Sequence, residues 1–208
     1  MKKNVLKAVN VLKELYPTAI CSLNYEDPFQ LLVATRLSAQ CTDARVNLIT
    51  PNLFKALPNA KSFKDANITV IENLIHSCGL YKTKAKDLKA MSTMLVDKYD
   101  SKIPNTLNEL TSLPGIGRKT ANLIMGDVFK QPAVVTDTHF IRICNRLGFV
   151  NTKNPLKVEK TMRELLEDEE SNDFCHRTVL FGRDICTARS PKCEKCPLKN
   201  ICKYVKKP

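Results

Sequence analysis

The sequence predicts an all-α protein. Apolar residues recur at three- and four-residue spacing through most of the 208-residue chain, which is the spacing of one buried helix face. Helix-start signals, namely Asp or Asn before Pro and Thr-x-x-Glu boxes, precede several of these stretches. Sustained alternation of apolar and polar residues is absent from the sequence. Residues 133–135 form the only plausible strand, which is too short to build a sheet.

Three helices are expected before residue 80. The first carries apolar residues at helical spacing and ends at a proline: Val5, Val9, Leu12 and Tyr16, then Pro17. Asp27-Pro28 predicts an N-cap followed by proline at the first helical position, and residues 29–37 are apolar enough for a buried helix. Thr69-x-x-Glu72 predicts a capping box that opens a helix ending at Gly79.

The later helices follow the same rules. Leu88, Met91 and Leu95 mark one buried face. Thr106-x-x-Glu109 predicts a second capping box. Asn154-Pro155 predicts the start of a further helix, whose inward residues are Val158, Met162, Leu165 and Leu166.

The charge balance favours a polyanionic partner. The chain has 33 Lys and Arg against 21 Asp and Glu, for a net charge of +12. Phosphate contacts release counterions, so this charge favours nucleic acid, the alternative being a basic protein without such a partner. No apolar stretch is long enough to span a bilayer, and no apolar core of a secretory signal follows the first lysines. We therefore expect a cytoplasmic protein.

The nine cysteines suggest a metal site rather than a disulfide framework, because their number is odd and four of them lie close together near the C-terminus. These four are Cys186, Cys193, Cys196 and Cys202, with the spacing C-x6-C-x2-C-x5-C. Four thiolates suit structural zinc, although zinc sites commonly use two close pairs and only Cys193 and Cys196 form one. Four cysteines also bind an iron–sulfur cluster. The same loop carries Arg189 and Lys192, which we expect to contact DNA phosphates.

The run Leu-Pro-Gly-Ile-Gly-Arg-Lys-Thr-Ala over residues 113–121 predicts a tight turn between two helices. Gly115 and Gly117 permit positive φ and close approach of another backbone. The turn would present N–H groups beside a helix N-terminus, which is a site for a DNA phosphate. An ordinary glycine-capped helix–helix turn is the alternative.

The full run resembles the helix-hairpin-helix of the DNA glycosylase superfamily. Residues 134–139, Val-Val-Thr-Asp-Thr-His, resemble the signature that follows this hairpin, with Thr136 in place of the usual Val. The cysteine spacing resembles the C-terminal cluster of endonuclease III. Together these motifs identify the chain as a member of the endonuclease III family along essentially its whole length.

The resemblance implies a two-lobed helix-hairpin-helix DNA glycosylase fold. A six-helix barrel lobe with the hairpin would span residues 22–129. An iron–sulfur cluster lobe would combine residues 1–21 with 130–208, and the four cysteines would bind a 4Fe–4S cluster. The implied activity is base-excision DNA repair by a bifunctional glycosylase and abasic-site lyase. Its partner would be double-stranded DNA with damaged bases or abasic sites, oxidised pyrimidines in particular, and we expect a monomer.

The resemblance also implies roles for single residues. Lys119 would be the nucleophile that forms a Schiff base with the sugar, and Asp137 would stabilise positive charge on the sugar. Asp137 also stands where an N-cap is expected, so capping alone is the alternative. Gln40 and Leu80 would enter the DNA beside the flipped nucleotide, Asp43 would line the base pocket, and Arg118 with the two hairpin glycines would contact DNA.

Two other readings of the sequence compete. A monofunctional relative from the adenine-removing branch would share the cluster, but that branch lacks a lysine in the hairpin. A DNA-binding module with structural zinc would have no chemistry.

Overall fold

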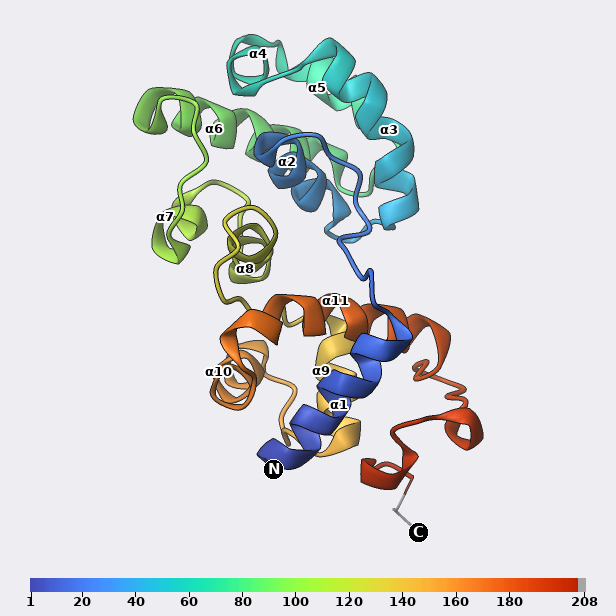
Figure 1. Ribbon diagram of the computed structural model, residues 1–208. Helices are drawn as coiled ribbons and strands as arrows, with labels where there is room; N and C mark the ends of the chain where they lie inside the picture. The colour runs from blue at the N-terminus through green and yellow to red at the C-terminus, as the bar shows by residue number, and fades with distance from the viewer. Residues whose placement is uncertain (206–208) are drawn as a thin grey trace. The chain divides into compact units, whose positions relative to one another are not determined.

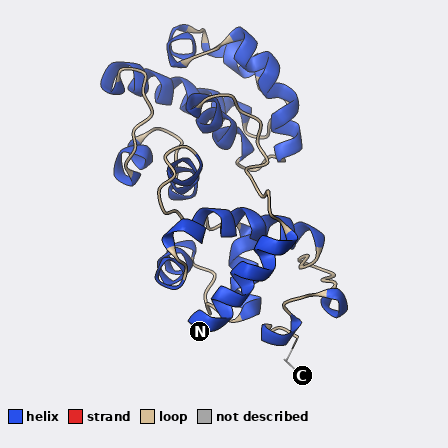
Figure 2. Cartoon of the chain, in the orientation of Figure 1, coloured by secondary structure: helices blue, strands red, loops and turns tan. Residues whose placement is uncertain are grey.

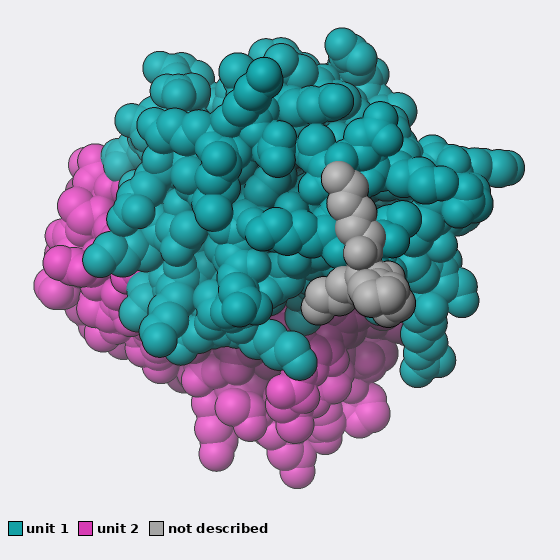
Figure 3. Space-filling view, turned by 90° about the horizontal axis from the view of Figure 1, so that it is seen from below, with its two compact units in different colours: residues 1–21, 130–208 teal, residues 22–129 magenta. Residues whose placement is uncertain are grey.

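The computed structural model describes residues 1–205, and all regular structure in that range is helical (Figures 1 and 2). The all-α prediction is therefore confirmed. No helix among residues 1–205 is long and apolar enough to cross a membrane. The chain forms two compact units, coloured in Figure 3: unit 1 comprises Met1–Cys21 and Lys130–Pro208, and unit 2 comprises Ser22–Phe129.

Unit 2 is built around helix α2, Pro28–Ser38. Leu31, Leu32, Val33 and Ala34 are each fully buried, because α2 packs against neighbours on several sides. Those neighbours are α3 (Asp43–Ala56), α6 (Tyr81–Tyr99) and α8 (Arg118–Asp127). The short helices α4 (Ala60–Asp65) and α5 (Ile68–Leu74) pack on α6, and α7 (Leu107–Ser112) packs on α8.

The predicted helix starts are mostly confirmed in unit 2. Asp27 caps α2, accepting a hydrogen bond from Gln30 N at 2.9 Å, with Pro28 as the first helical residue. Thr106 caps α7 by accepting from the backbone N of Glu109 at 3.3 Å. The Glu109 carboxylate accepts from the hydroxyl of Thr106 at 2.6 Å and not from its backbone N–H, so the cap is confirmed but the reciprocal capping box is not formed.

The capping box predicted at Thr69 is wrong. Asn67 is the N-cap of α5 and accepts from Thr69 N at 3.0 Å, which places Thr69 inside the first turn. Asn is at least as good a cap as Thr, so the earlier residue takes the position. The helix also ends at Leu74, several residues before Gly79.

Unit 1 contains α1 (Lys2–Leu15), α9 (Thr138–Leu147), α10 (Pro155–Leu165) and α11 (Asp168–Asp184). Helix α11 packs against both α1 and α9, and Phe140 of α9 meets Phe174 of α11 edge to face with ring centroids 6.0 Å apart. Two 3-10 turns follow, η1 (Cys193–Lys195) and η2 (Lys199–Ile201). Asn154 caps α10 as expected.

Residues 133–135, the expected strand, form a buried loop, and no strand occurs within residues 1–205. Their backbone donors bind side chains of α11 instead of a neighbouring strand. Ala133 N donates to Ser171 Oγ at 3.1 Å, and Val135 N donates to Cys175 Sγ at 3.2 Å. A buried segment can therefore be extended without a sheet, because its N–H groups are satisfied by another helix.

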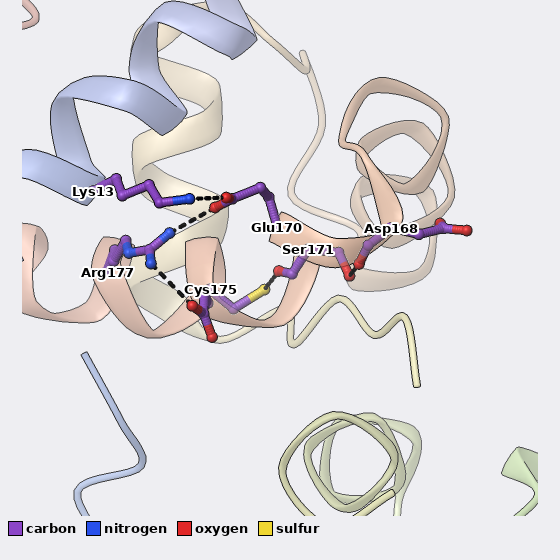
Figure 4. A network of polar contacts seen from close by, with 7 residues as sticks. Lys13, Asp168, Glu170, Ser171, Cys175 and Arg177 are labelled. Atoms are coloured by element: carbon purple, nitrogen blue, oxygen red, sulfur yellow. Dashed lines mark hydrogen bonds and ion pairs between the residues drawn. The ribbon is translucent and has the colours of Figure 1, made fainter. Parts of the chain in front are cut away.

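An ion-pair network centred on Glu170 of α11 joins α1 to α11 (Figure 4). Arg177 is 3% exposed and donates to Glu170 at 2.8 Å and to Asp173 at 2.9 Å. Lys13 of α1 pairs with the same Glu170 carboxylate. A buried guanidinium is stable only when its charge is compensated, so Glu170 holds both cations and joins the two helices.

This network predicts a pH-dependent part of the stability. The hydrogen bond from Lys13 lowers the pKa of Glu170 below its usual value, Arg177 adds to the shift, and burial opposes it. Because the folded-state pKa is depressed, the contribution is present above the unfolded value of about 4.3 and is lost as pH falls through the folded pKa. Glu170→Gln should lower the urea midpoint at pH 7, with the deficit shrinking as the pH is lowered below about 4.

Glu164→Gln, an exposed change on α10, is the control and should follow the wild type at both pH values. An equal deficit for Glu170→Gln at both pH values would show that the charge of Glu170 does not support folding.

Candidate active site and metal centre

The predicted hairpin lies between α7 and α8, and its two glycines differ in what they permit. Gly115 has φ of +76°, and a Cβ there would lie 2.7 Å from Arg36 Nε and 2.8 Å from Asp87 Cβ. Only glycine fits this position. Gly117 is the N-cap of α8, and nothing lies within 4 Å of where its Cβ would be. Its missing side chain therefore leaves the backbone open to approach.

The N-terminus of α8 has the character of an anion site. Gly117 supplies no side-chain cap, so the first N–H groups of α8 are not satisfied by the N-cap residue. Arg118 and Lys119 are the first two helical residues, and both are exposed. A cationic, glycine-bordered helix start suits a phosphate, and it holds an exposed amine beside that phosphate.

Asp137 lies in unit 1 as the N-cap of α9. Its Oδ1 accepts a hydrogen bond from Phe140 N at 2.7 Å, which confirms the predicted cap. The side chain is half-buried, and the preceding Thr136 is buried. Capping engages Oδ1 and holds the carboxylate in one orientation at the start of a rigid helix.

His139, the last residue of the same motif, is structural in its contacts. Burial lowers the pKa of His139, Asp137 partly offsets this, and Arg142 and Arg183 lower it further. The Nδ1 of His139 lies 3.1 Å from Arg142 Nη2. A Cβ on Gly182 would come within 2.6 Å of the same Nδ1. The imidazole therefore packs on α11 in its neutral form.

The two loops expected to enter DNA lie side by side in unit 2. Gln40 lies between α2 and α3, and Leu80 is the N-cap of α6. Both are exposed, Leu80 by 59%, and both have left-handed backbone with φ of 53° and 59°. A Cβ on Gly79 would lie 3.3 Å from the carbonyl oxygen of Gln40, so the loops touch through their backbones. Asp43, at the start of α3, accepts from Ser22 Oγ at 2.6 Å.

The loop that begins at Cys186 is held by two arginines one turn apart on α9. Arg142 donates to the carbonyl of Cys186 through Nε at 3.2 Å and Nη2 at 3.0 Å. Arg146 donates to Cys186 Sγ at 3.2 Å and to the carbonyls of Thr187 and Ala188 at 2.7 and 2.9 Å. The Tyr204 ring covers the Arg146 guanidinium at 4.5 Å.

The four C-terminal cysteines influence one another electrostatically. Burial raises the pKa of the Cys196 thiol, a hydrogen bond from the Leu198 backbone opposes this, and the other three cysteines raise it further. Four thiolates brought together would repel unless a cation lay among them, so four cysteines within one short segment suit a positively charged metal centre. Within residues 1–205, no three His, Cys, Asp or Glu side chains are arranged to bind a single metal ion.

The basic residues of this loop are exposed, as a phosphate contact requires. Arg189 follows the two carbonyls that Arg146 holds. Lys192 pairs with Asp184 at 3.2 Å, so a phosphate would have to compete with that carboxylate. The ion pair is itself exposed and therefore weak.

Residues 33–168 match the HhH-GPD superfamily of base excision DNA repair proteins, and residues 186–202 match the iron–sulfur binding domain of endonuclease III. Endonuclease III of Synechocystis sp. is 41% identical over 97% of this chain and 92% of the relative. The Escherichia coli enzyme is 34% identical over 99% of this chain and 98% of the relative. The chain belongs to the endonuclease III family.

The solved structures agree with this family. The structure of a trapped endonuclease III–DNA covalent intermediate superposes with a TM-score of 0.94 and 39% identity, covering 99% of this chain and 97% of that one. A thermostable thymine-DNA glycosylase has the same fold, with a TM-score of 0.88 at 24% identity over 98% and 97% of the two chains.

Membership settles the class of the protein. It is a DNA-binding base-excision repair enzyme, a DNA glycosylase and abasic-site lyase. The iron–sulfur domain begins at Cys186 and ends at Cys202, so the cofactor is the 4Fe–4S cluster expected from the cysteine spacing and the zinc alternative is not favoured. The monofunctional alternative is not favoured either, since the relatives are endonuclease III enzymes.

Several residues of the site escaped the sequence analysis. Arg142 and Arg146 are four residues apart on α9, a spacing that places both on one face and is the signal that was available. Lys84 of α6 is fully buried and donates to the carbonyl of Leu37 at 2.8 Å. Nothing local distinguishes it from the exposed lysines of the same helix.

Arg146→Met should reduce cluster content, because it removes the donor to Cys186 Sγ and releases the loop carbonyls of Thr187 and Ala188. Protein purified anaerobically should contain about four iron atoms per wild-type chain. The variant should contain less iron and lose its visible absorption faster in air. Lys160→Met on α10, an exposed cation of the same unit, is the control. Iron content equal to wild type in Arg146→Met would show that the hydrogen bonds from Arg146 are not needed to retain the cluster.

Proposed function

We propose that this enzyme removes oxidised pyrimidines, such as thymine glycol, from double-stranded DNA and then cleaves the abasic site with Lys119. The observation that carries the proposal is the exposed amine of Lys119, directly after an uncapped glycine hairpin at the start of α8. A phosphate held by the first N–H groups of that helix would bring a deoxyribose close to the same amine.

The chemistry requires one nucleophile and one fixed negative charge. The neutral amine attacks C1′ of the sugar as the damaged base leaves with the bonding electrons. The nitrogen then loses a proton and the C1′–O4′ bond opens, which gives a Schiff base and a free 4′-hydroxyl. The Schiff base makes the proton at C2′ acidic, and removal of that proton expels the 3′ phosphate by β-elimination. Asp137 would offset the positive charge that develops on the sugar during base loss. Its cap bond through Oδ1 orients the group for this task.

The remaining predicted contacts with DNA involve residues that are exposed or half-buried. Gly115, Gly117 and Arg118 would hold a phosphate, and Arg189 and Lys192 would hold others. Gln40 and Leu80 would fill the gap left by the flipped nucleotide, and Asp43 would line the base pocket. The paired left-handed loops support a joint role for Gln40 and Leu80.

In this proposal, each compact unit corresponds to one of the two predicted domains. Unit 2 would be the six-helix barrel domain that presents the hairpin, and unit 1 the cluster domain. Cys186, Cys193, Cys196 and Cys202 would bind the cluster, which would keep the basic loop in a fixed shape for DNA. The substrate would be duplex DNA with damaged bases or abasic sites, and the enzyme would act in the cytoplasm as a monomer.

Lys119→Gln should abolish covalent trapping while retaining affinity for abasic DNA. Borohydride reduces the Schiff base to a stable amine, so wild-type protein should cross-link to an oligonucleotide that carries one thymine glycol. Lys61→Gln is a matched control, because Lys61 is likewise the exposed second residue of a helix, α4. Undiminished trapping by Lys119→Gln would assign the nucleophile to another amine.

Asp137→Asn separates catalysis from capping. Asn caps helices about as well as Asp, so the variant should melt within a few degrees of wild type. Loss of the negative charge should slow single-turnover base release by about 10²-fold or more. Asp27→Asn changes the N-cap of α2 in the same way and should leave the rate unchanged. Normal base release by Asp137→Asn would leave the residue as a cap only.

A further inference from the structure

The loops that carry Gln40 and Leu80 are joined by a pair of thiols. Cys41 directly follows Gln40, and Cys78 precedes Leu80 by two residues. Their Sγ atoms lie 3.8 Å apart, in thiol–thiol contact. Cys41 is half-exposed, whereas Cys78 is 1% exposed. Cys41 is therefore the more accessible residue of the pair, and its sulfur contacts that of the buried Cys78.

The surroundings of the pair are rigid. The two loop backbones touch at Gly79 and the carbonyl of Gln40. Below them, the fully buried Lys84 donates to the carbonyl of Leu37, at the end of α2. The sulfurs thus stay close because three segments of unit 2 pack together, and little further motion is needed to bring them into bonding range.

The local charges favour a stepwise reaction. Burial raises the pKa of Cys78 to about 11, its hydrogen bond with Cys41 contributes, and Lys84 and Arg45 partly offset the rise. Cys78 therefore remains a thiol at neutral pH. Cys41, the more accessible residue of the pair, would react first, and Cys78 would resolve the product.

We propose that Cys41 and Cys78 form a reversible disulfide with each other when a low-molecular-weight disulfide, such as glutathione disulfide, oxidises them. This bond would slow engagement of damaged DNA. Cys41 thiolate attacks one sulfur of the reagent and releases one thiolate. Cys78 then attacks the Cys41 sulfur of the mixed disulfide, and its proton passes to the second thiolate as that thiolate is released. The two protein thiols are oxidised by two electrons, and the reagent is reduced to two thiols.

The bond would act on the residues beside it. A disulfide requires sulfurs about 2.0 Å apart, so the two Sγ atoms would approach each other by about 1.8 Å. Gln40 and Leu80 lie one and two residues from the bonded cysteines and could no longer adjust independently. The effect on activity rests on the proposed insertion of Gln40 and Leu80 into DNA, whereas formation of the disulfide does not.

The first experiment measures the bond alone. Holoenzyme is equilibrated anaerobically in glutathione buffers of increasing oxidised fraction, alkylated and digested, and the peptides are identified by mass spectrometry. Wild type should yield one Cys41–Cys78 cross-linked peptide that dithiothreitol removes. Cys21→Ser should behave identically, because Cys21 is a half-exposed cysteine of unit 1, outside the pair. Cys41→Ser and Cys78→Ser should yield none. Full alkylation of both thiols, or a stable glutathione adduct on Cys41, would overturn the proposal.

The second experiment measures the consequence. Single-turnover excision of thymine glycol by the oxidised wild type should fall roughly tenfold or more, since displacement of a positioning group by about 1 Å has effects of this size. Dithiothreitol should restore the rate, and Cys41→Ser should show equal rates in both buffers. Iron is assayed in each sample to confirm that the cluster is intact. An unchanged rate in cross-linked protein would reject the regulation. Inactivity of the reduced enzyme would instead contradict the proposed function, without affecting the mass-spectrometric result.

Discussion

The hydrogen bonds from Arg142 and Arg146 to Cys186 are the constraint on which unit 1 depends. They hold the first cysteine of the iron–sulfur domain on helix α9, and the N-cap of that same helix is Asp137. One helix of ten residues thus fixes both the carboxylate and the start of the metal loop. Because both groups are attached to one continuous helix, a displacement of Cys186 that moved the helix would also move Asp137. The cluster domain therefore supports the geometry of Asp137 as well as its own loop.

Two glycines, which have no side chain, determine the geometry of the hairpin in unit 2. Gly115 turns the chain where any Cβ would collide with Arg36 and Asp87, and Gly117 opens the start of α8 to an approaching group. A helix N-terminus without a side-chain cap is normally a small loss of stability. Gly117 gives α8 no side-chain cap, and we propose that the first turn of this helix binds a phosphate instead.

Local features were predictable from the sequence and long-range ones were not. The caps at Asp27, Thr106 and Asn154 depend on residues within one turn, and all three are confirmed. The box at Thr69 failed because Asn67 competes for the same role. Residues 133–135 resemble a strand in composition, yet their donors bind Ser171 and Cys175, partners about forty positions away. The clamp by Arg146 and the buried Lys84 likewise depend on carbonyls supplied by distant segments. The roles of Lys119 and Asp137 in catalysis remain predictions.

Gln40 and Leu80 are two of the four non-glycine residues of unit 2 with left-handed backbone, the others being Asp100 and Ser101. Such conformations cost of order 1 kcal/mol or more for each non-glycine residue, and they persist only when their surroundings enforce them. The enforcing contacts are the touching backbones at Gly79 and the buried bond from Lys84 to Leu37. Cys41 and Cys78 lie within this same region, so a covalent change there acts on conformations that are already unfavourable on their own. A small displacement of the sulfurs would then be expressed mainly at Gln40 and Leu80, because the helices on either side are held by the packed core.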